Sequence, residues 1–450
     1  MKINVVCDFL RLDEYKGRFH IAEKAVYLSP DPQLGNVHFD PRSVERDLGR
    51  KLDSLSLDLC EIAAFVYLAD KSVARGEFDR WARTLSFLVP VRNPAKWNSV
   101  KRILRNTVAT LTGDNVQFSF VKRREEKDDA GPHRPPNSTP AAATNSDSIS
   151  LFSGGLDSFA GAVYLLGQGR RPLFVSHYVN ATLKGVQANL MAEIGSGFGR
   201  AVEHFQYRLT SRRPRDERFT LKARESSHRA RSFLFMSFAA AAAATRVFRD
   251  IYICENGVLA LNVPISEARK GSRSTRHAHP LYLRYFNELI ENLYEREFAV
   301  QNPFLFWTKG EEAEFLRESG FGPTIRQTVS CWGYPNQTIR FNDSNHCGYC
   351  LPCLVRRASL AAAGLESYDD HYHRDAFGSN HRNKALDRNV NDLIYFCRSV
   401  ASLSFNDLVY RYPEFVTIEA HRSPVLEDKV TKIIKVYKKF ADEVLAIAKG

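Results

Sequence analysis

The stretch Ser148-Ile149-Ser150-Leu151-Phe152-Ser153-Gly154-Gly155-Leu156-Asp157-Ser158 places a short apolar run directly before a loop rich in glycine and serine. The apolar run predicts a buried strand, and the apolar residues 159–166 predict a helix after the loop. Glycines let a backbone approach an anion closely, and the free amides of a helix's first turn bind phosphate. The stretch therefore predicts a phosphate-binding loop. The alternative interpretation is a tight turn in which Asp157 or Ser158 caps the helix.

Asp157 is an acidic residue in a loop that is expected to bind an anion. Phosphate would repel it unless a cation lies between them, so its expected role is to hold or orient Mg²⁺. The loop is not of the Walker type, because no Gly-Lys-Ser/Thr follows it. It resembles instead the SGGxDS loop of the PP-loop ATP pyrophosphatases. That resemblance implies ATP binding and cleavage between the α and β phosphates, with ATP held by Ser153, Gly154, Gly155, Leu156, Asp157 and Ser158.

The chain around this loop alternates predicted strands with predicted helices. Strands are expected at 148–152, 172–176, 201–207 and 251–254, and helices at 159–166, 184–193 and 226–245. Such alternation with short links predicts an α/β fold with a doubly wound parallel sheet. Ligands of such sheets bind at the carboxyl ends of the strands, near a topological switch point.

Composition divides the chain into four parts. Residues 125–147 are rich in Pro, Ser, Thr and Asn with almost no large apolar residue, and they predict a flexible linker. Residues 1–124 are expected to form an α+β accessory domain without a chemical motif, whose role is scaffolding or contact with a partner. The α/β domain is expected over 148–365. A helical C-terminal extension, 366–450, ends in a basic helix whose apolar face is expected to pack on the protein's own core.

The charge balance and the termini bear on partners and location. The chain has 450 residues, with 63 Lys and Arg against 51 Asp and Glu, a net charge of +12. This surplus favours an anionic partner such as a nucleotide, a nucleic acid or an acidic protein. The N-terminus breaks into charge before an export segment could form, and the longest nearly apolar stretch, 233–244, is too short to span a bilayer. These features predict a cytoplasmic protein without a membrane partner.

Four of the eight cysteines lie close together in the sequence, at Cys331, Cys347, Cys350 and Cys353. Their C-x-x-C spacing in a chain without an export signal predicts metal binding instead of disulfides. Four thiolates complete a tetrahedral zinc site, and Gly348 and Pro352 predict a knuckle-like loop because three successive i+3 cysteines cannot share one helix face. An iron–sulfur cluster and unmetallated buried cysteines are the alternatives.

Polar residues near these motifs have several interpretations. His346 is expected to lie beside the metal site in a supporting role, and Arg356 and Arg357 are expected to offset part of its negative charge. His277 and His279 look like a metal-binding pair. Since no third ligand is near them in sequence, they are interpreted as surface or substrate-loop histidines.

Loop and cysteine cluster, in this order, resemble the QueC family of 7-cyano-7-deazaguanine synthases over roughly residues 148–365. Residues 330–333 (SCWG) and 347–356 (CGYCLPCLVR) look like the family's zinc motif. Residues 231–237 (RSFLFMS) look like its ARN-x-x-FLS helix, with Ser232 at the usual asparagine position. Residues 303–309 (PFLFWTK) look like its P-x-x-x-x-(T/S)-K stretch, which implies that Lys309 lies beside the phosphates.

The resemblance implies a reaction and a set of cofactors. Such enzymes adenylate the carboxylate of 7-carboxy-7-deazaguanine, convert it to an amide with ammonia, and activate it again to reach the nitrile. ATP, Mg²⁺ and Zn²⁺ are therefore the expected cofactors. Asp157 and Lys309 are implied to act on charge that develops on the departing pyrophosphate, and Arg231 to act on the same charge or on the substrate carboxylate.

One segment departs from the family pattern. The family carries an Asp-Tyr-Ser-Gly-Tyr-Pro-Asp-Cys-Arg-type segment near its deazapurine site, whereas residues 255–262 here read ENGVLALN. The added N-terminal domain and linker resemble QueC-like proteins of bacterial antiphage operons, the QatC branch. In that branch the activated deazapurine is expected to pass to an amine on a partner protein encoded in the same operon, in place of ammonia.

Two other functions stay open. A tRNA-modifying PP-loop enzyme would contact phosphates through basic residues. The segment that carries these basic residues also contains acidic residues and equally predicts a solvated loop. Nucleic acid is therefore not the favoured partner. The basic residues are Arg212, Arg213, Arg215, Arg218, Lys222 and Arg224. A non-enzymatic nucleotide-binding subunit would keep the loop without turnover.

Overall fold

The computed structural model describes most of the chain. The described residues are 2–8, 25–31, 35–39, 41–75, 82–123, 145–214, 220–221, 225, 227–265, 276–333, 345–378, 384–420 and 428–448. All but the last three residues of the predicted linker, 125–147, lie outside these ranges. So do Arg215, Arg218, Lys222 and Arg224 of the basic run.

The central sheet has five parallel strands in the order β11-β10-β6-β7-β8. The chain starts in the middle at β6, runs outward through β7 and β8, and returns to the other side of β6 through β10 and β11. The switch point therefore lies between β6 and β10, as a doubly wound sheet requires. This arrangement confirms the predicted α/β class. The strands are β6 (Ser148–Leu151), β7 (Pro172–Tyr178), β8 (His204–Arg208), β10 (Asp250–Tyr252) and β11 (Ala299–Gln301).

Helices cover both faces of this sheet. Side chains alternate along a strand, so Ile149 and Leu173 pack into one core while Phe152 and Phe174 pack into the other. The first face is covered by α6 (Arg231–Arg246), whose apolar side chains belong to the same core. The second face packs against α4 (Leu156–Gly167), α5 (Ala181–Gly197) and α9 (Lys309–Glu318). Burial on both faces explains why these strands read as continuous apolar runs.

The N-terminal unit has its own four-stranded sheet, β2-β1-β4-β5, and every pairing in it is parallel. Its strands are β1 (Lys2–Cys7), β2 (Ala25–Leu28), β4 (Thr84–Val91) and β5 (Asn115–Lys122). The sequence-based prediction of an α+β domain is therefore wrong in its class. Parallel neighbours need crossover connections, and α3 (Pro94–Thr112) is the crossover between β4 and β5, which makes the unit α/β.

The N-terminal unit and the central domain share one hydrophobic core. Helix α2 (Ser54–Ser72) packs on α6, and α3 packs on α8 (Pro280–Tyr294). The buried carboxylate of Asp70 in α2 accepts a hydrogen bond from the backbone amide of Ala230, just before α6, at 2.8 Å. Short strands β3 (Val37–His38) and β9 (Thr210–Ser211) also pair across the two units. The N-terminal unit thus helps to fix where α6 begins.

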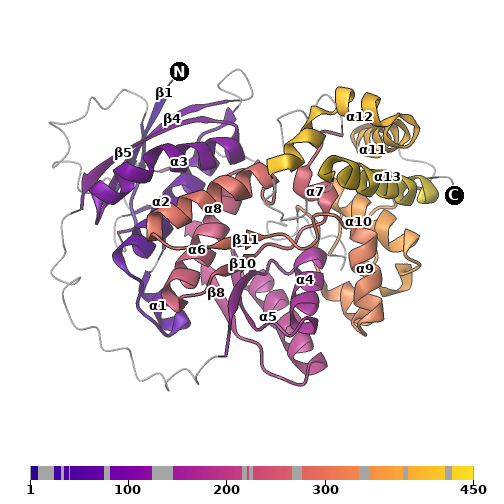
Figure 1. The fold of residues 1–450 in the computed structure, drawn as a ribbon, viewed down its shortest axis with the longest axis horizontal. Coiled ribbons are helices and arrows are strands. Elements are labelled where there is room, and N and C mark those ends of the chain that lie inside the picture. The colour runs from indigo at the N-terminus through magenta and orange to yellow at the C-terminus, as the bar shows by residue number, and fades with distance from the viewer. Residues whose placement is uncertain are drawn as a thin grey trace.

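The C-terminal region is helical, as the sequence predicts, and lies at the opposite end of the molecule from the N-terminal unit (Figure 1). Its last helix, α13 (Lys429–Ile447), packs on α10 (Leu351–Ala362) and α11 (Lys384–Ser402). Ile433, Tyr437 and Val444 on its apolar face are buried, which confirms the prediction that the face packs on the protein's own core. The remaining short elements are α1 (Pro41–Leu48), α7 (Gly257–Leu261), α12 (Phe405–Arg411), and the 3-10 turns η5 (Gly322–Gln327), η6 (Glu366–Tyr368) and η7 (Pro413–Ala420).

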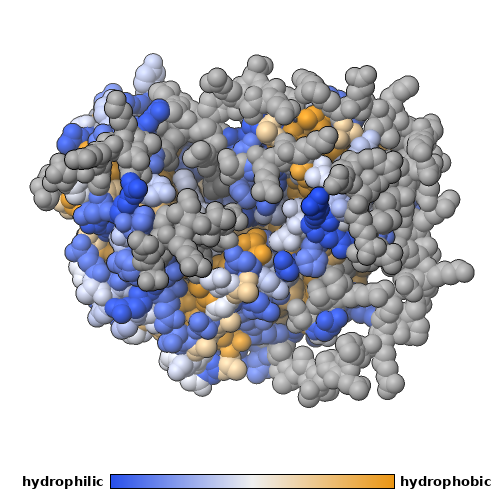
Figure 2. Space-filling model, turned by 180° about the vertical axis from the view of Figure 1, so that it is seen from behind, coloured by the Kyte–Doolittle hydropathy of each residue, from blue (hydrophilic) through white to orange (hydrophobic). Residues whose placement is uncertain are grey.

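The surface is mixed in polarity. On the face drawn in Figure 2, hydrophilic residues surround small separate hydrophobic patches among the residues that carry colour. Among the described residues, none of the helices combines the length and the apolar character that crossing a bilayer demands.

Candidate active site and metal centre

The predicted phosphate loop lies between β6 and α4, at the carboxyl end of the central strand. Gly154 adopts a left-handed backbone with φ of +87°, a conformation that costs glycine little. Gly155 is the N-cap of α4, and within the described structure no side chain caps this helix. The alternative interpretation, with Asp157 or Ser158 as the cap, is therefore wrong. Leu156 starts the helix and is buried, so the amides of the first turn face the loop without a competing side-chain cap.

Two hydroxyls and two amides hold the loop in shape. The Ser153 and Ser158 hydroxyl oxygens lie 3.1 Å apart, and Ser158 also donates to the Gly155 carbonyl at 3.0 Å. The Gly155 amide donates to the Ser153 hydroxyl at 3.2 Å. From α5, Gln187 donates its side-chain amide to the Ser153 carbonyl at 3.2 Å. The loop is therefore preorganised before any ligand binds.

Asp157 lies in the first turn of α4 and receives donors from two other segments. The side-chain amide of Asn256, which follows β10, donates to its Oδ1 at 2.8 Å. The ammonium of Lys309, at the start of α9, binds its Oδ2. Burial would raise the pKa of Asp157, but the Lys309 charge and these hydrogen bonds hold it well below its usual range. The structure thus brings together two of the three predicted catalytic residues at the β6–β10 switch point.

Lys309 is positioned by a capping box at the start of α9. Thr308 is the N-cap, its hydroxyl accepts from the Glu311 amide, and the Glu311 carboxylate accepts from the Thr308 amide. The Lys309 side chain is only 2% exposed. Burial would lower the pKa of this ammonium, but the neighbouring carboxyl groups raise it, so Lys309 carries its charge.

A carboxylate from the C-terminal extension fastens this same helix start. Glu443 of α13 is buried and accepts hydrogen bonds from the hydroxyls of Thr308 and, at 3.1 Å, Ser359 of α10. A side chain at Gly310 would bring its Cβ to 2.7 Å from a Glu443 oxygen, so the glycine permits this close approach. The C-terminal extension therefore helps to position Lys309. No sequence motif indicates the contact between Glu443 and Thr308 through which it does so.

Glu255 and His277 form a pair beside Asp157 that sequence patterns did not predict. Glu255 follows β10, and its carboxylate binds Nε2 of His277. Burial, followed by the Asp157 charge, raises the pKa of Glu255. Burial would lower the pKa of His277, but Glu255 raises it. The His277 side chain is 32% exposed and ion-paired, so it is only partly on the surface, and its interpretation as a substrate-loop histidine stays a prediction. Its Glu255 partner was foreseeable, since residues after the strand beside a phosphate loop face the same edge of the sheet.

His279 has a structural role instead. It is buried, and its Nδ1 accepts a hydrogen bond from the Leu281 amide at 3.2 Å, which caps α8. Its Nε2 lies 3.1 Å from the Thr417 hydroxyl. The interpretation as a surface or substrate-loop histidine is therefore wrong for His279, and the two histidines do not form a metal pair.

Arg231, the third predicted catalytic residue, lies at the start of α6 and is exposed. Its guanidinium lies over the Phe235 ring, 5.7 Å from the ring centroid. Among the described residues, no hydrogen bond or ion pair joins it to Asp157 or Lys309. Its charge is close enough to His277 to oppose part of the rise that Glu255 causes in the pKa of that histidine. A catalytic role of Arg231 stays a prediction.

The four predicted cysteine ligands form one cluster. Their Sγ atoms all lie within 4.8 Å of one another, and none is in a disulfide. The Sγ–Sγ separations are 3.8 Å for Cys347–Cys353, 4.0 Å for Cys331–Cys350 and 3.3 Å for Cys350–Cys353. A tetrahedral zinc ion with bonds of about 2.3 Å would hold its sulfurs about 3.8 Å apart. The cluster is therefore compatible with a single structural zinc ion, and a four-iron cube would need wider spacing.

The loop around the cluster is shaped as a knuckle, as predicted. Gly348 has φ of +81°, and a Cβ there would lie 1.9 Å from the Arg374 carbonyl oxygen. Cys350 is the N-cap of α10, and Pro352 stands in the first turn of that helix. The three close cysteines thus sit in a loop, at a cap and in a first turn, which is how they avoid the unsuitable spacing of one helix face.

His346 and Arg356 support the cluster from outside, whereas Arg357 is engaged elsewhere. His346 is buried and its Nε2 accepts from the Ser330 amide at 3.3 Å, next to Cys331, which agrees with the predicted supporting role. Arg356 is fully buried, and it binds Asp369, the Ser330 hydroxyl at 3.2 Å and the Ile325 carbonyl at 2.8 Å. It thereby ties α10 to the segment that carries Cys331. The second arginine, Arg357, pairs with Asp375.

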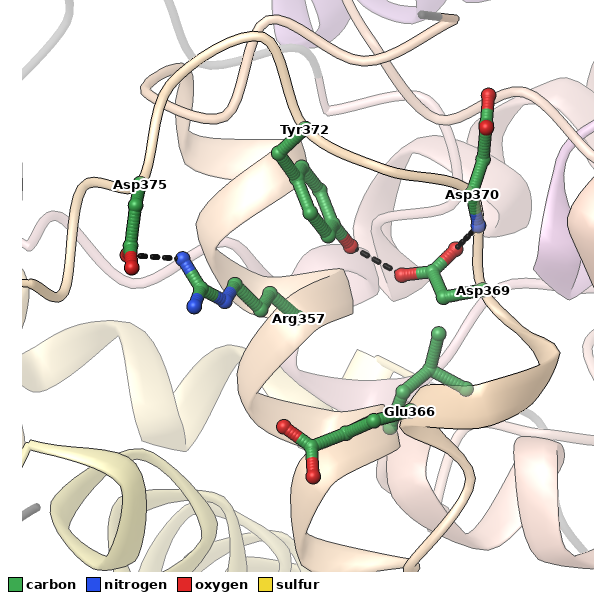
Figure 3. Close-up of a pocket in the computed structure, with 7 residues that line it drawn as sticks. Arg357, Glu366, Asp369, Asp370, Tyr372 and Asp375 are labelled. Atoms are coloured by element: carbon green, nitrogen blue, oxygen red, sulfur yellow. Dashed lines mark hydrogen bonds and ion pairs between the residues drawn. The ribbon is translucent and has the colours of Figure 1, made fainter.

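A cavity of about 280 Å³ lies next to the knuckle, on α10 and the segment after η6 (Figure 3). Glu366, Asp369, Asp370 and Asp375 line it together with Arg357, Leu360 and Tyr372. In Figure 3 the Arg357 guanidinium points to Asp375, and the Tyr372 hydroxyl donates to Asp369. Four carboxyl groups against one guanidinium would repel a triphosphate. This cavity is therefore not a nucleotide site.

Comparison with known proteins supports a relationship to one family. A family model described as Queuosine biosynthesis protein QueC matches residues 214–364. The matched segment begins after the phosphate loop and contains Arg231, Lys309 and the cysteine cluster. A search of curated proteins finds no match to the chain. The QueC match thus supports ATP-dependent chemistry of the 7-deazaguanine pathway, and the four-cysteine cluster agrees with it.

Proposed function

We propose that the protein is an ATP-dependent ligase that adenylates the carboxylate of 7-carboxy-7-deazaguanine, or a close analogue, and transfers the acyl group to a nitrogen nucleophile with release of AMP and pyrophosphate. One observation carries the proposal above the others. Asp157 and Lys309 come from different helices and meet beside a preorganised glycine loop at the sheet's switch point. The QueC match over residues 214–364 supplies the substrate class.

The loop would bind the phosphates and leave the α-phosphorus open to the substrate carboxylate. The amides at the start of α4 would donate hydrogen bonds to phosphate oxygens, while the Ser153 and Ser158 hydroxyls hold the loop in the shape that presents these amides. Lys309 then stabilises the negative charge that grows on the departing pyrophosphate. Mg²⁺, held by Asp157, would supply further charge neutralisation at the same phosphates. AMP replaces the poor leaving group of a free carboxylate with a good one, so a nitrogen nucleophile can displace it.

The nucleophile in this proposal is an amine on a partner protein, and the biological setting is antiphage defence of the QatC type. Two features support it. Residues 255–262 differ from the family's deazapurine segment, and they contribute Glu255 and Asn256 to the site. The N-terminal unit adds a second parallel sheet that shares a core with the catalytic domain. A housekeeping-type synthase that uses ammonia is the second candidate, favoured by the QueC match itself.

Mass spectrometry of the products tests the proposal. Purified protein is incubated with ATP, Mg²⁺ and 7-carboxy-7-deazaguanine, once with ammonium and once with the proteins encoded alongside it. The proposal predicts AMP formation that needs the deazapurine carboxylate, and a partner protein whose mass rises by one deazaguanine acyl group. Efficient nitrile formation with ammonium alone would support the housekeeping candidate. Salt-sensitive tRNA binding with tRNA-dependent AMP formation would overturn both.

A further inference from the structure

A chain of polar contacts leads from Lys309 to a histidine at the edge of the site. The Lys309 ammonium binds Asp157. The Asn256 side-chain amide donates to Asp157 at 2.8 Å and to Glu255 at 3.3 Å, and Glu255 binds Nε2 of His277. The His277 side chain is 32% exposed, against 14% for Asp157 and 2% for Lys309. Among the ionisable groups of this chain, His277 is thus the most accessible.

The acids at the inner end of the chain are unsuited to accept a proton. Burial would raise the pKa of Asp157, but the Lys309 charge and its hydrogen bonds hold that pKa well below its usual range. One of these bonds is shared with Glu312 in the first turn of α9. Burial, followed by the Asp157 charge, raises the pKa of Glu312 well above its ordinary value, so Glu312 keeps its proton. Asp157 is therefore a weak base, and Glu312 has no proton to gain.

His277 lies where three elements of the catalytic domain meet. The Ser232 hydroxyl donates to the His277 carbonyl at 2.9 Å, which ties the His277 backbone to the first turn of α6. The charged groups that act on its imidazole are Glu255 after β10, Arg231 in α6 and Asp157 in α4. Burial would lower the pKa of His277, but Glu255 raises it, and Arg231 opposes part of that rise. The imidazole is thus held between the phosphate-loop side and the start of α6.

Transfer of an acyl group from AMP to nitrogen releases a proton. A neutral amine attacks the acyl carbon, the C–N bond forms, and the C–O bond to AMP breaks with its electron pair on AMP. The nitrogen loses one proton, and a positioned base accelerates such a step by about 10²–10⁴-fold. A carboxylate at one imidazole nitrogen keeps a proton there and makes the ring a better base. The pair of Glu255 and His277 has this composition.

We propose that His277 is the general base that accepts the proton of the nitrogen nucleophile, and that Glu255 is the positioning residue that orients its imidazole. The inference rests on the proposed function, because it needs an acyl adenylate in the site. It assigns the two half-reactions to different residues. Asp157 and Lys309 act on the phosphates during adenylation, whereas His277 acts only after the adenylate has formed.

Separate assays of the two half-reactions test this division. Exchange of pyrophosphate into ATP reports adenylation, and amide formation from trifluoroethylamine, a weakly basic amine, reports transfer. His277→Gln is expected to slow transfer at least about 100-fold with little change in exchange. Hydroxylamine attacks acyl adenylates without a catalyst, so its trapping rate should stay near that of the wild type.

His371→Gln is the matched control, because His371 is exposed and pairs with Asp370. Its transfer rate should equal that of the wild type. Equal transfer rates in His277→Gln and His371→Gln would overturn the proposal. So would a loss of exchange in His277→Gln as large as its loss of transfer.

The pH dependence of transfer tests the role of Glu255. A protonated imidazole cannot accept a proton, so the rate should rise with pH through the pKa of His277 and then level off. Removing the Glu255 charge lowers that pKa, so the rise should move to lower pH in Glu255→Gln. Glu314→Gln should keep the wild-type profile, because Glu314 is half exposed on α9 and pairs with Arg317. An unchanged midpoint in Glu255→Gln would refute the positioning role.

A nuclear magnetic resonance titration of the histidine side chains needs neither substrate nor a His277 variant. The proposal predicts that the pKa of His277 is lower in Glu255→Gln than in the wild type and in Glu314→Gln. Equal values would overturn it. This shift in a wild type that shows no exchange would count against the proposed function. Normal exchange with unaffected transfer in His277→Gln would count against the general base alone.

Discussion

The backbone amide of Val329 donates a hydrogen bond to the carbonyl of Gly154 at 2.9 Å. Gly154 belongs to the phosphate loop, and Val329 stands two residues before the cysteine ligand Cys331. In addition, a Cβ on Gly155 would lie 3.4 Å from the Val329 carbonyl oxygen. The segment that leads into the cysteine cluster thus packs directly against the phosphate loop. A change in the conformation of the knuckle should therefore also change the conformation of the loop.

Removing one cysteine ligand should therefore affect both zinc and nucleotide binding. Cys353→Ala is expected to lower bound zinc from one ion per chain to nearly none and to destabilise the fold by several kcal/mol, because metal binding contributes directly to folding. ATP affinity should fall as well. Elemental analysis and nucleotide titration measure these effects. Cys397→Ala is the matched control, since Cys397 is a buried cysteine in α11 outside the cluster. Full zinc retention by Cys353→Ala would refute the assignment of Cys353 as a zinc ligand.

Glycine at position 348 should be needed for the knuckle even when all four cysteines are present. Gly348→Ala places a Cβ 1.9 Å from the Arg374 carbonyl oxygen, in a left-handed conformation. We expect the variant to lose most of its zinc. Gly364→Ala is the control that distinguishes backbone strain from a steric clash. Gly364 is also left-handed, with φ of +67°, but it has open space around it. That control should retain zinc and cost only about 1 kcal/mol of stability.

The close packing of α4 on the segment that follows β10 gives a prediction that does not involve the metal. A Cβ at Gly161 would lie 2.3 Å from the Cys254 sulfur. Gly161→Ala should therefore destabilise the fold by about 1–3 kcal/mol through overpacking. Chemical denaturation measures the loss. The Gly161→Ala/Cys254→Ala double variant should lose less stability than the sum of the losses in the two single variants. Strictly additive losses would show that the two residues do not collide.

Glu443 should make the stability depend on pH. Burial raises the pKa of Glu443 from 4.5 to about 7. Between these values the folded state keeps a proton that the unfolded chain has lost, so a rise in pH favours unfolding. From pH 5 to pH 8, the free energy of unfolding of the wild type should fall by about 1–3 kcal/mol relative to Glu443→Gln.

Denaturation at several pH values measures that difference for Glu443. Asp442→Asn serves as the control, because Asp442 is the exposed neighbour on the same helix. Its free energy of unfolding should follow the wild type across this range. If the Glu443→Gln curve also ran parallel to the wild type, the carboxyl would not be protonated in the folded state.

The strand–glycine loop–helix unit, the central sheet and the clustering of the four cysteines could be predicted from sequence because each depends on local chemistry. A strand, two glycines and a helix lie next to one another in the chain, and C-x-x-C spacing is short. Lys309 was placed beside the loop only through the family resemblance, since its contact with Asp157 joins residues far apart in the chain.

The N-terminal unit and the acids around Lys309 could not be predicted in the same way. Apolar runs indicate strands but not whether neighbouring strands are parallel, so the class predicted for the N-terminal unit was wrong. Glu312 and Glu443 look like ordinary polar residues on helices. Only the packing of α9 against α4 and α13 shows that both are buried.

Carboxylate-dependent exchange of labelled pyrophosphate into ATP tests the central claim most directly, because it reports reversible adenylation without needing the final nucleophile. The account predicts exchange that requires 7-carboxy-7-deazaguanine and that falls about 10²–10³-fold in Asp157→Asn and Lys309→Met, but not in Glu314→Gln. Zinc content and circular dichroism establish that each variant is folded. Exchange that is unaffected in Asp157→Asn and Lys309→Met would contradict the account. So would a lack of exchange when folded, zinc-loaded wild-type protein is given this carboxylate.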